Sequence, residues 1–114
     1  MVERTIIKII ERFVDTLGKE GIKVDKVILY GSYTQGRQRK DSDIDVAIIS
    51  RDFGKDTVDE GMKLFRIAGG IDPRIEPVPV SLESYEKDTW LPLIYEIREN
   101  GIEMKIGCKE GISF

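Results

Sequence analysis

Asp43 and Asp45 are the two residues whose type and spacing most clearly indicate chemistry. Residues 43–49, DIDVAII, are predicted to form a strand, in which side chains two residues apart share a face about 7 Å from each other. Two carboxylates at the start of an otherwise apolar strand are costly unless they are paired or bind a cation, and hard oxygen ligands favour Mg²⁺ or Mn²⁺. Asp-Ser-Asp is also a common turn composition, so ordinary acids at the end of a loop are the alternative interpretation.

A predicted loop, residues 31–42, joins that strand to an earlier one, residues 24–30. Gly31 and Ser32 directly follow the earlier strand, so backbone N–H groups and the Ser32 hydroxyl can donate hydrogen bonds to an anion. Gly36 keeps the loop open for the close approach of a ligand. A phosphate-binding loop beside a two-carboxylate cation site is the combination that phosphoryl or nucleotidyl transfer requires.

The composition excludes several other kinds of chemistry. The 114 residues contain no His, which excludes Ser-His-Asp and Cys-His nucleophile systems, His-bearing zinc sites and an imidazole general base. Cys108 is the single cysteine, so neither an intrachain disulfide nor a Cys-rich zinc module is expected. The net charge of −3 does not favour binding of free nucleic acid. With no apolar segment of the ~20 residues that cross a membrane and no secretory signal, a cytoplasmic location is expected.

Residues 1–114 are expected to form one domain. Hydrophobic periodicity, glycines and prolines predict these elements in order: a helix over 2–18, strands over 24–30 and 43–49, a helix from Asp56 or Thr57 to about Ala68, an edge strand over 74–80 containing Pro77 and Pro79, a helix capped by Thr89 with Pro92 in its first turn, and a strand over 102–106. The stripes expected to be buried are Val58, Met62, Phe65 and Ala68 in the second helix, and Trp90, Ile94 and Ile97 in the last.

The motif Gly31-Ser32, then ten intervening residues, then Asp43-Ile44-Asp45, resembles the signature of the DNA-polymerase-β-like nucleotidyltransferase superfamily. Gly36 and the run from Ser42 to Asp45 narrow the resemblance to the minimal nucleotidyltransferases, which are short single-domain members. The resemblance covers essentially the whole chain. It implies an α/β (α+β) nucleotidyltransferase fold, in which a small mixed sheet of about four strands packs with helices. It also implies that Gly31, Ser32, Gly36 and Ser42 bind the nucleotide.

The family also requires a third carboxylate on a neighbouring strand, and Glu76 in residues 74–80 is the candidate. Asp72 is the alternative, although the Pro that follows it indicates a turn. The resemblance implies that Asp43, Asp45 and Glu76 hold two Mg²⁺ ions, with Mn²⁺ as a substitute. It further implies that ATP is the substrate and that AMP is transferred to a hydroxyl group.

Minimal nucleotidyltransferases are often encoded beside an all-helical protein of the HEPN type, a ribonuclease toxin. The resemblance therefore implies an antitoxin that transfers AMP to such a partner, or one that silences it by binding alone. Transfer to a small molecule or an RNA is a further alternative. Arg37, Arg39 and Lys40 lie inside the predicted phosphate loop, where they could contact the triphosphate or the partner, or belong to a solvated loop.

Overall fold

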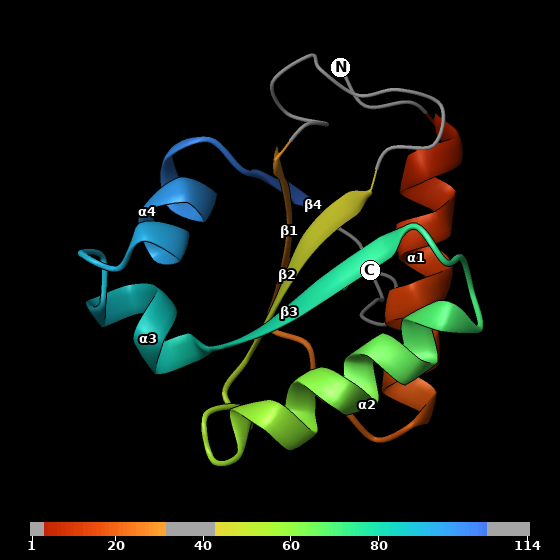
Figure 1. Ribbon diagram of the computed structural model, residues 1–114, viewed down its shortest axis with the longest axis horizontal. Helices are drawn as coiled ribbons and strands as arrows, with labels where there is room; N and C mark the ends of the chain where they lie inside the picture. Colours follow the sequence, from red (N-terminus) through yellow and green to blue (C-terminus); the bar gives the residue numbers. More distant parts are fainter. Residues whose placement is uncertain (1–3, 32–42, 105–114) are drawn as a thin grey trace, which may run out of the picture.

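The computed structural model describes residues 4–31 and 43–104 (Figure 1). Four helices and four strands are formed within these residues, and each predicted strand and helix core is present. In chain order they are α1 (Arg4–Lys19), β1 (Lys26–Tyr30), β2 (Ile44–Ser50), α2 (Thr57–Gly69), β3 (Ile75–Ser81), α3 (Leu82–Lys87), α4 (Pro92–Glu99) and β4 (Ile102–Met104). None of the described helices has both the length and the apolar character needed to cross a membrane.

The four strands form one mixed sheet in the order β3-β2-β1-β4, which confirms the expected small mixed sheet of about four strands. β1 pairs antiparallel with both β2 and β4. β2 pairs in parallel with β3, and α2 makes the crossover connection between them. β3 is therefore an edge strand, as its prolines predict, because a proline has no N–H to donate to a further strand.

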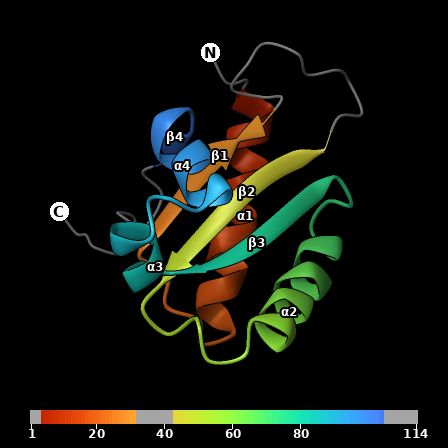
Figure 2. The same cartoon turned by 60° about the vertical axis from the view of Figure 1, so that its left-hand side comes forward.

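Helices cover both faces of this sheet (Figures 1 and 2). α1 and α2 pack on one face, over a core that includes Phe13, Val46, Ile48 and Leu64. α3 and α4 lie on the other face, where a second cluster is built from Ile28, Ala47, Ile49, Val80, Ile94 and Ile97. The alternation of β2 side chains between the two clusters follows from the two-residue period of a strand.

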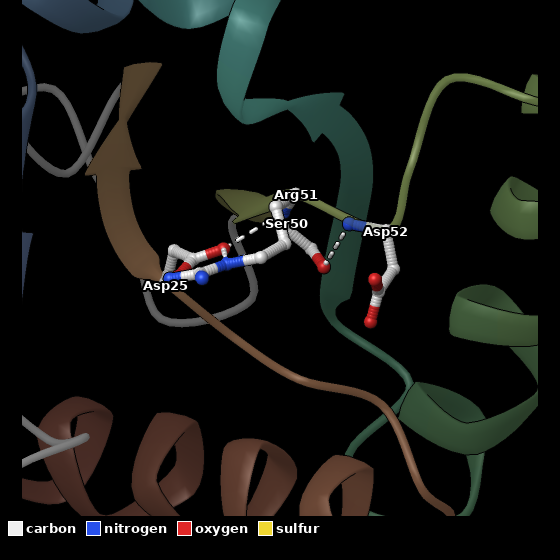
Figure 3. Close-up of polar contacts among 4 residues, drawn as sticks. All are labelled: Asp25, Ser50, Arg51 and Asp52. Atoms are coloured by element: carbon white, nitrogen blue, oxygen red, sulfur yellow. Dashed lines mark hydrogen bonds and ion pairs between the residues drawn. The ribbon is translucent and has the colours of Figure 1, made fainter.

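A polar clamp joins the start of β1 to the end of β2, far from the strand ends that carry the carboxylates (Figure 3). The Asp25 carboxylate accepts hydrogen bonds from the Arg51 backbone N–H at 2.7 Å and from the Arg51 guanidinium at 2.8 Å. These bonds hold the pKa of Asp25 below its usual value. The buried Ser50 hydroxyl accepts a hydrogen bond from the Asp52 N–H at 3.0 Å, which shapes the turn after β2.

The orientation predicted for α2 is wrong. Val58, Met62 and Phe65 are 71%, 67% and 59% exposed, and the buried stripe of α2 is made instead by Leu64, Ile67 and Ala68. The helix carries two apolar stripes, and periodicity alone does not choose between them. The stripe that packs includes Ala68, the one member of the predicted stripe that is buried.

The segment before α4 also differs from the prediction. Thr89 does not cap a helix, because α4 begins at Pro92 with Leu91 as its N-cap. Trp90 lies outside the helix and is 76% exposed, so it does not belong to the core. The short helix α3 was not predicted. It is capped by Ser81, whose hydroxyl accepts a hydrogen bond from the Ser84 N–H at 3.0 Å.

Candidate active site

Three strands bring polar side chains to one place, at the end of the sheet where β1 finishes and β2 and β3 begin (Figure 1). Asp45 on β2 is the register partner of Glu76 on β3 and of Tyr30 on β1. Register partners point to the same face and neighbouring strands are about 4.8 Å apart, so the three side chains form a row across the sheet. Asp43 lies two residues before Asp45 and is exposed. The strand pattern therefore places Glu76 on the same face as Asp45, as predicted.

The carboxylate of Asp45 is in an unfavourable electrostatic environment. Partial burial raises its pKa above the usual value, and the nearby charges of Asp43 and Glu76 raise it further. The ion pairs formed within residues 4–31 and 43–104 do not include Asp43, Asp45 or Glu76. Clustered carboxylates with a raised pKa are typical of a functional site.

Tyr30 lies beside Asp45, and Glu96 lies near Tyr30. The sequence left stacking on a base and simple packing open for Tyr30, with packing favoured, and gave Glu96 no site role. The Tyr30 hydroxyl is half-buried beside Asp45, and its aromatic ring packs on the α3 and α4 face. Burial raises the pKa of Tyr30 to about 12, and the charges of Asp45, Glu76 and Glu96 contribute to that rise. The phenol therefore stays protonated at neutral pH and is a hydrogen-bond donor among carboxylates. Glu96 reaches this region from α4, a contact that no local sequence pattern reveals.

Gly31 follows β1 directly and is needed for two physical reasons. Its φ of +79° lies in the region that L-residues with a side chain rarely adopt. A Cβ at this position would also overlap the Asp45 carboxylate, with Asp45 Cγ only 3.2 Å away. The sequence predicts Gly31 as a phosphate-binding residue. The structure adds that its missing side chain leaves the space that the Asp45 carboxylate occupies.

Asp72, the alternative third carboxylate, forms its hydrogen bonds within a turn before β3. Its carboxylate accepts hydrogen bonds from the Arg74 N–H at 2.8 Å and from the Arg74 guanidinium at 3.0 Å. These bonds lower its pKa below the usual value, in contrast to Asp45. Asp72 therefore stabilises the turn, and Glu76 remains the third acid that lies beside Asp45.

The acids can be tested for their fit to a divalent cation. Within the described residues, no group of three acidic or cysteine side chains is placed to hold a metal ion as it stands. Asp45 and Glu76 nevertheless suit such an ion, because they supply hard oxygen ligands and because a cation would relieve the repulsion that raises the pKa of Asp45. The predicted nucleotide-binding residues Ser32, Gly36 and Ser42, the basic residues Arg37, Arg39 and Lys40, and Cys108 lie outside the described residues.

Solved structures share this fold. A provisionally assigned nucleotidyltransferase from Sulfolobus solfataricus superimposes with a TM-score of 0.60 at 16% identity, over 87% of this chain and 78% of that one. A toxin–antitoxin complex with AMP-PNP gives a TM-score of 0.51 at 26% identity, over 82% of this chain and 71% of that one. A mutant of the MntA–HpeT toxin–antitoxin pair gives 0.50 at the same identity and coverage.

Sequence comparison agrees with the structural comparison. A Methanocaldococcus jannaschii protein with a provisional assignment as a protein adenylyltransferase is 32% identical over 102 residues, which cover 87% of this chain and 98% of that protein. The polymerase beta nucleotidyltransferase family matches residues 8–106. Because this match spans most of the chain and includes every strand of the sheet, the chain belongs to the polymerase beta nucleotidyltransferase family and is a nucleotidyltransferase.

Proposed function

We propose that this nucleotidyltransferase transfers AMP from ATP to a hydroxyl group of a helical partner protein of the HEPN type and thereby acts as an antitoxin. The observation that carries the proposal is the register pairing of Asp45 with Glu76 beside Gly31, with Asp43 just before the strand. The toxin–antitoxin complex with AMP-PNP supports both a nucleotide substrate and a partner protein. The relative assigned as a protein adenylyltransferase supports the choice of AMP and of a protein acceptor.

Asp43, Asp45 and Glu76 would hold the divalent cations, which are Mg²⁺ by preference and Mn²⁺ as a substitute. When bound, such cations neutralise charge on the triphosphate and on the departing pyrophosphate. The acceptor oxygen forms a bond to the α-phosphorus while the bond from that phosphorus to the pyrophosphate oxygen breaks. Glu76 is exposed at the start of β3, where its carboxylate can take the proton that the acceptor hydroxyl loses.

The remaining residues of the site bind and orient. The Tyr30 phenol lies beside Asp45 and stays protonated, so it can donate a hydrogen bond to a bound ligand or to a carboxylate of the site. Gly31 leaves room for Asp45, and the backbone that follows, together with Ser32, Gly36 and Ser42, binds the phosphates. Each of these groups acts before the transfer step, by placing the α-phosphorus in line with the acceptor.

A second function, silencing by binding alone, is favoured by the structural similarity to toxin–antitoxin complexes. In that case the partner would be held without a covalent change. The two functions differ in one observable quantity, which is the mass of the partner after incubation with nucleotide.

The experiment pairs the chain with the helical protein encoded by the adjacent reading frame and measures the intact mass of both after incubation with ATP and Mg²⁺. A gain of one or more AMP units on the partner, absent with Asp45→Asn, supports the enzyme. The matched control is Asp52→Asn, which removes an exposed acid from the opposite end of β2 and should leave transfer unchanged. Silencing that persists in Asp45→Asn, without a mass change in either protein, would leave only the binding function.

A further inference from the structure

α2 carries an apolar face that the fold does not use. Val58, Met62 and Phe65 follow one another at steps of four and three residues, and each is more than half exposed. Figure 2 shows α2 at the outer margin of the molecule, with β3 and α1 on its inner side. We call the outer surface formed by Val58, Met62 and Phe65, together with Asp59 and Arg66 beside them, the α2 face.

The apolar part of the α2 face is long enough to receive another helix. Its three side chains span about two helical turns, which is the spacing by which helices pack against each other. A shallow hollow runs along the same residues and is lined by α2 alone. Three large apolar side chains aligned on one exposed helix face are typical of an interaction surface rather than of scattered surface residues.

The charges on the α2 face indicate what covers it. Asp59 lies in the first turn of α2 and Arg66 in the last, on the same side of the apolar stripe. Seven residues separate them by about 10.5 Å along the axis, which is too far for an ion pair within one helix. Within the described residues, neither of them takes part in an ion pair.

Two copies of α2 packed antiparallel would pair the opposite charges and bury the apolar stripe of each copy. Met62 would lie at the two-fold axis, and Val58 of each copy would meet Phe65 of the other. The same rotation places Asp59 of each copy opposite Arg66 of the other, so a single surface supplies two ion pairs. A self-complementary surface of this kind is what a two-fold symmetric dimer requires.

The neighbouring edge of the sheet does not compete for this contact. β3 is an edge strand, and Pro77 and Pro79 remove two of the N–H donors that an added strand would need. Association through strand addition is therefore disfavoured on this side of the molecule. The α2 face, and not the β3 edge, is the surface on this side that suits a second copy.

We propose that the α2 face is the interface of a two-fold symmetric homodimer, formed by antiparallel packing of α2 from two copies of this chain. The interface lies on the α1 and α2 side of the sheet, whereas Asp45 and Glu76 point to the α3 and α4 side. Both active sites stay open to nucleotide and acceptor in the dimer. The proposal does not depend on the transferase activity.

The first test is sedimentation velocity of the full chain over a concentration series. The wild-type chain should show a concentration-dependent dimer, and Met62→Glu should be monomeric, because it places two carboxylates at the two-fold axis. Tyr95→Glu is the matched control, since it adds the same charge at an exposed apolar residue of α4 and should leave the dimer intact. Circular dichroism confirms that each variant is folded. A wild-type chain that is monomeric throughout, or a Met62→Glu dimer, would overturn the proposal.

The second test reverses the charges. Asp59→Arg and Arg66→Asp should each weaken the dimer by about tenfold, because each change creates two repulsive contacts. The double variant should restore the dimer, since every pair is then reversed in both copies. Failure of the double variant to recover would exclude the antiparallel arrangement. Protection of the α2 face by the helical partner, with a monomeric chain, would assign the face to that partner instead.

Discussion

Replacing Gly31 with alanine separates the two physical reasons for glycine at that position. The positive φ costs an alanine about 1–2 kcal/mol relative to glycine. The added Cβ also overlaps the Asp45 carboxylate, which must leave its preferred rotamer at a cost of about 0.5–1.5 kcal/mol. Gly31→Ala should therefore lower the free energy of unfolding by roughly 2–3 kcal/mol in the absence of nucleotide and metal.

Gly21 provides a matched control, because its φ of +85° is nearly the same and no atom lies within 4 Å of the position of its Cβ. Gly21→Ala should lose only the φ contribution, about 1–2 kcal/mol. The difference between the two variants measures the contact with Asp45. That difference should shrink when Gly31→Ala is combined with Asp45→Ala, which removes the overlapping oxygens.

Urea denaturation of the wild type, Gly31→Ala, Gly21→Ala, Asp45→Ala and the Gly31→Ala, Asp45→Ala double variant, with the slopes compared, gives the required free energies. Equal losses for Gly31→Ala and Gly21→Ala would refute the claim that Gly31 makes room for Asp45. A loss that is unchanged by Asp45→Ala would refute it as well. Gly31→Ala should also weaken metal-dependent ATP binding, which Gly21→Ala should not do, since only the first displaces a site carboxylate.

Three further variants test other parts of the structure. Asp45→Asn should be more stable than the wild type at pH 7 and equally stable at pH 3, because the raised pKa of Asp45 in the folded state makes its ionised carboxylate destabilising as pH rises. Added Mn²⁺ should stabilise the wild type but not this variant. Thermal unfolding at the two pH values, with and without Mn²⁺, measures both effects. Asp25→Asn should be less stable than the wild type at pH 7, and the difference should vanish as pH falls through the lowered pKa of Asp25, as followed by urea denaturation across pH. Gly101→Ala should cost about 1–3 kcal/mol of unfolding free energy, because its Cβ would overlap Ile28 and the Ile97 carbonyl, whereas Gly69→Ala, with open space around it, should not destabilise.

Strand periodicity was sufficient to place the carboxylates of the candidate site on one face of the sheet. The alternation in residues 43–49 and 74–80 assigned Asp45 and Glu76 each to one face of its own strand. The parallel register then places these two faces on the same side of the sheet. The aspartate before a proline was expected in a turn, and Asp72 lies in one. Where a side chain's position depends on local contacts or on the two-residue period of a strand, the sequence carries enough information to place it.

Other parts of the site and fold depend on contacts between distant elements. α2 has two apolar stripes, and only its packing on β3 and α1 decides that Leu64 is buried and Met62 is not. Glu96 approaches Tyr30 because α4 folds back over β1, which no local pattern encodes. Trp90 is exposed because the helix begins two residues later, and helix starts are set by cap geometry as much as by hydrophobic spacing.

The parallel pairing of β2 with β3 has a consequence for folding. Asp45 and Glu76 are neighbours in space but are separated by 31 residues of chain, which include the whole of α2. The antiparallel contact of Tyr30 with Asp45 closes a shorter loop, so its entropic cost is lower. The carboxylate pair therefore forms only when the crossover through α2 has closed and β3 has paired with β2. If Asp45 and Glu76 serve transfer as proposed, transfer activity requires this long closure as well as the pairing of β1 with β2.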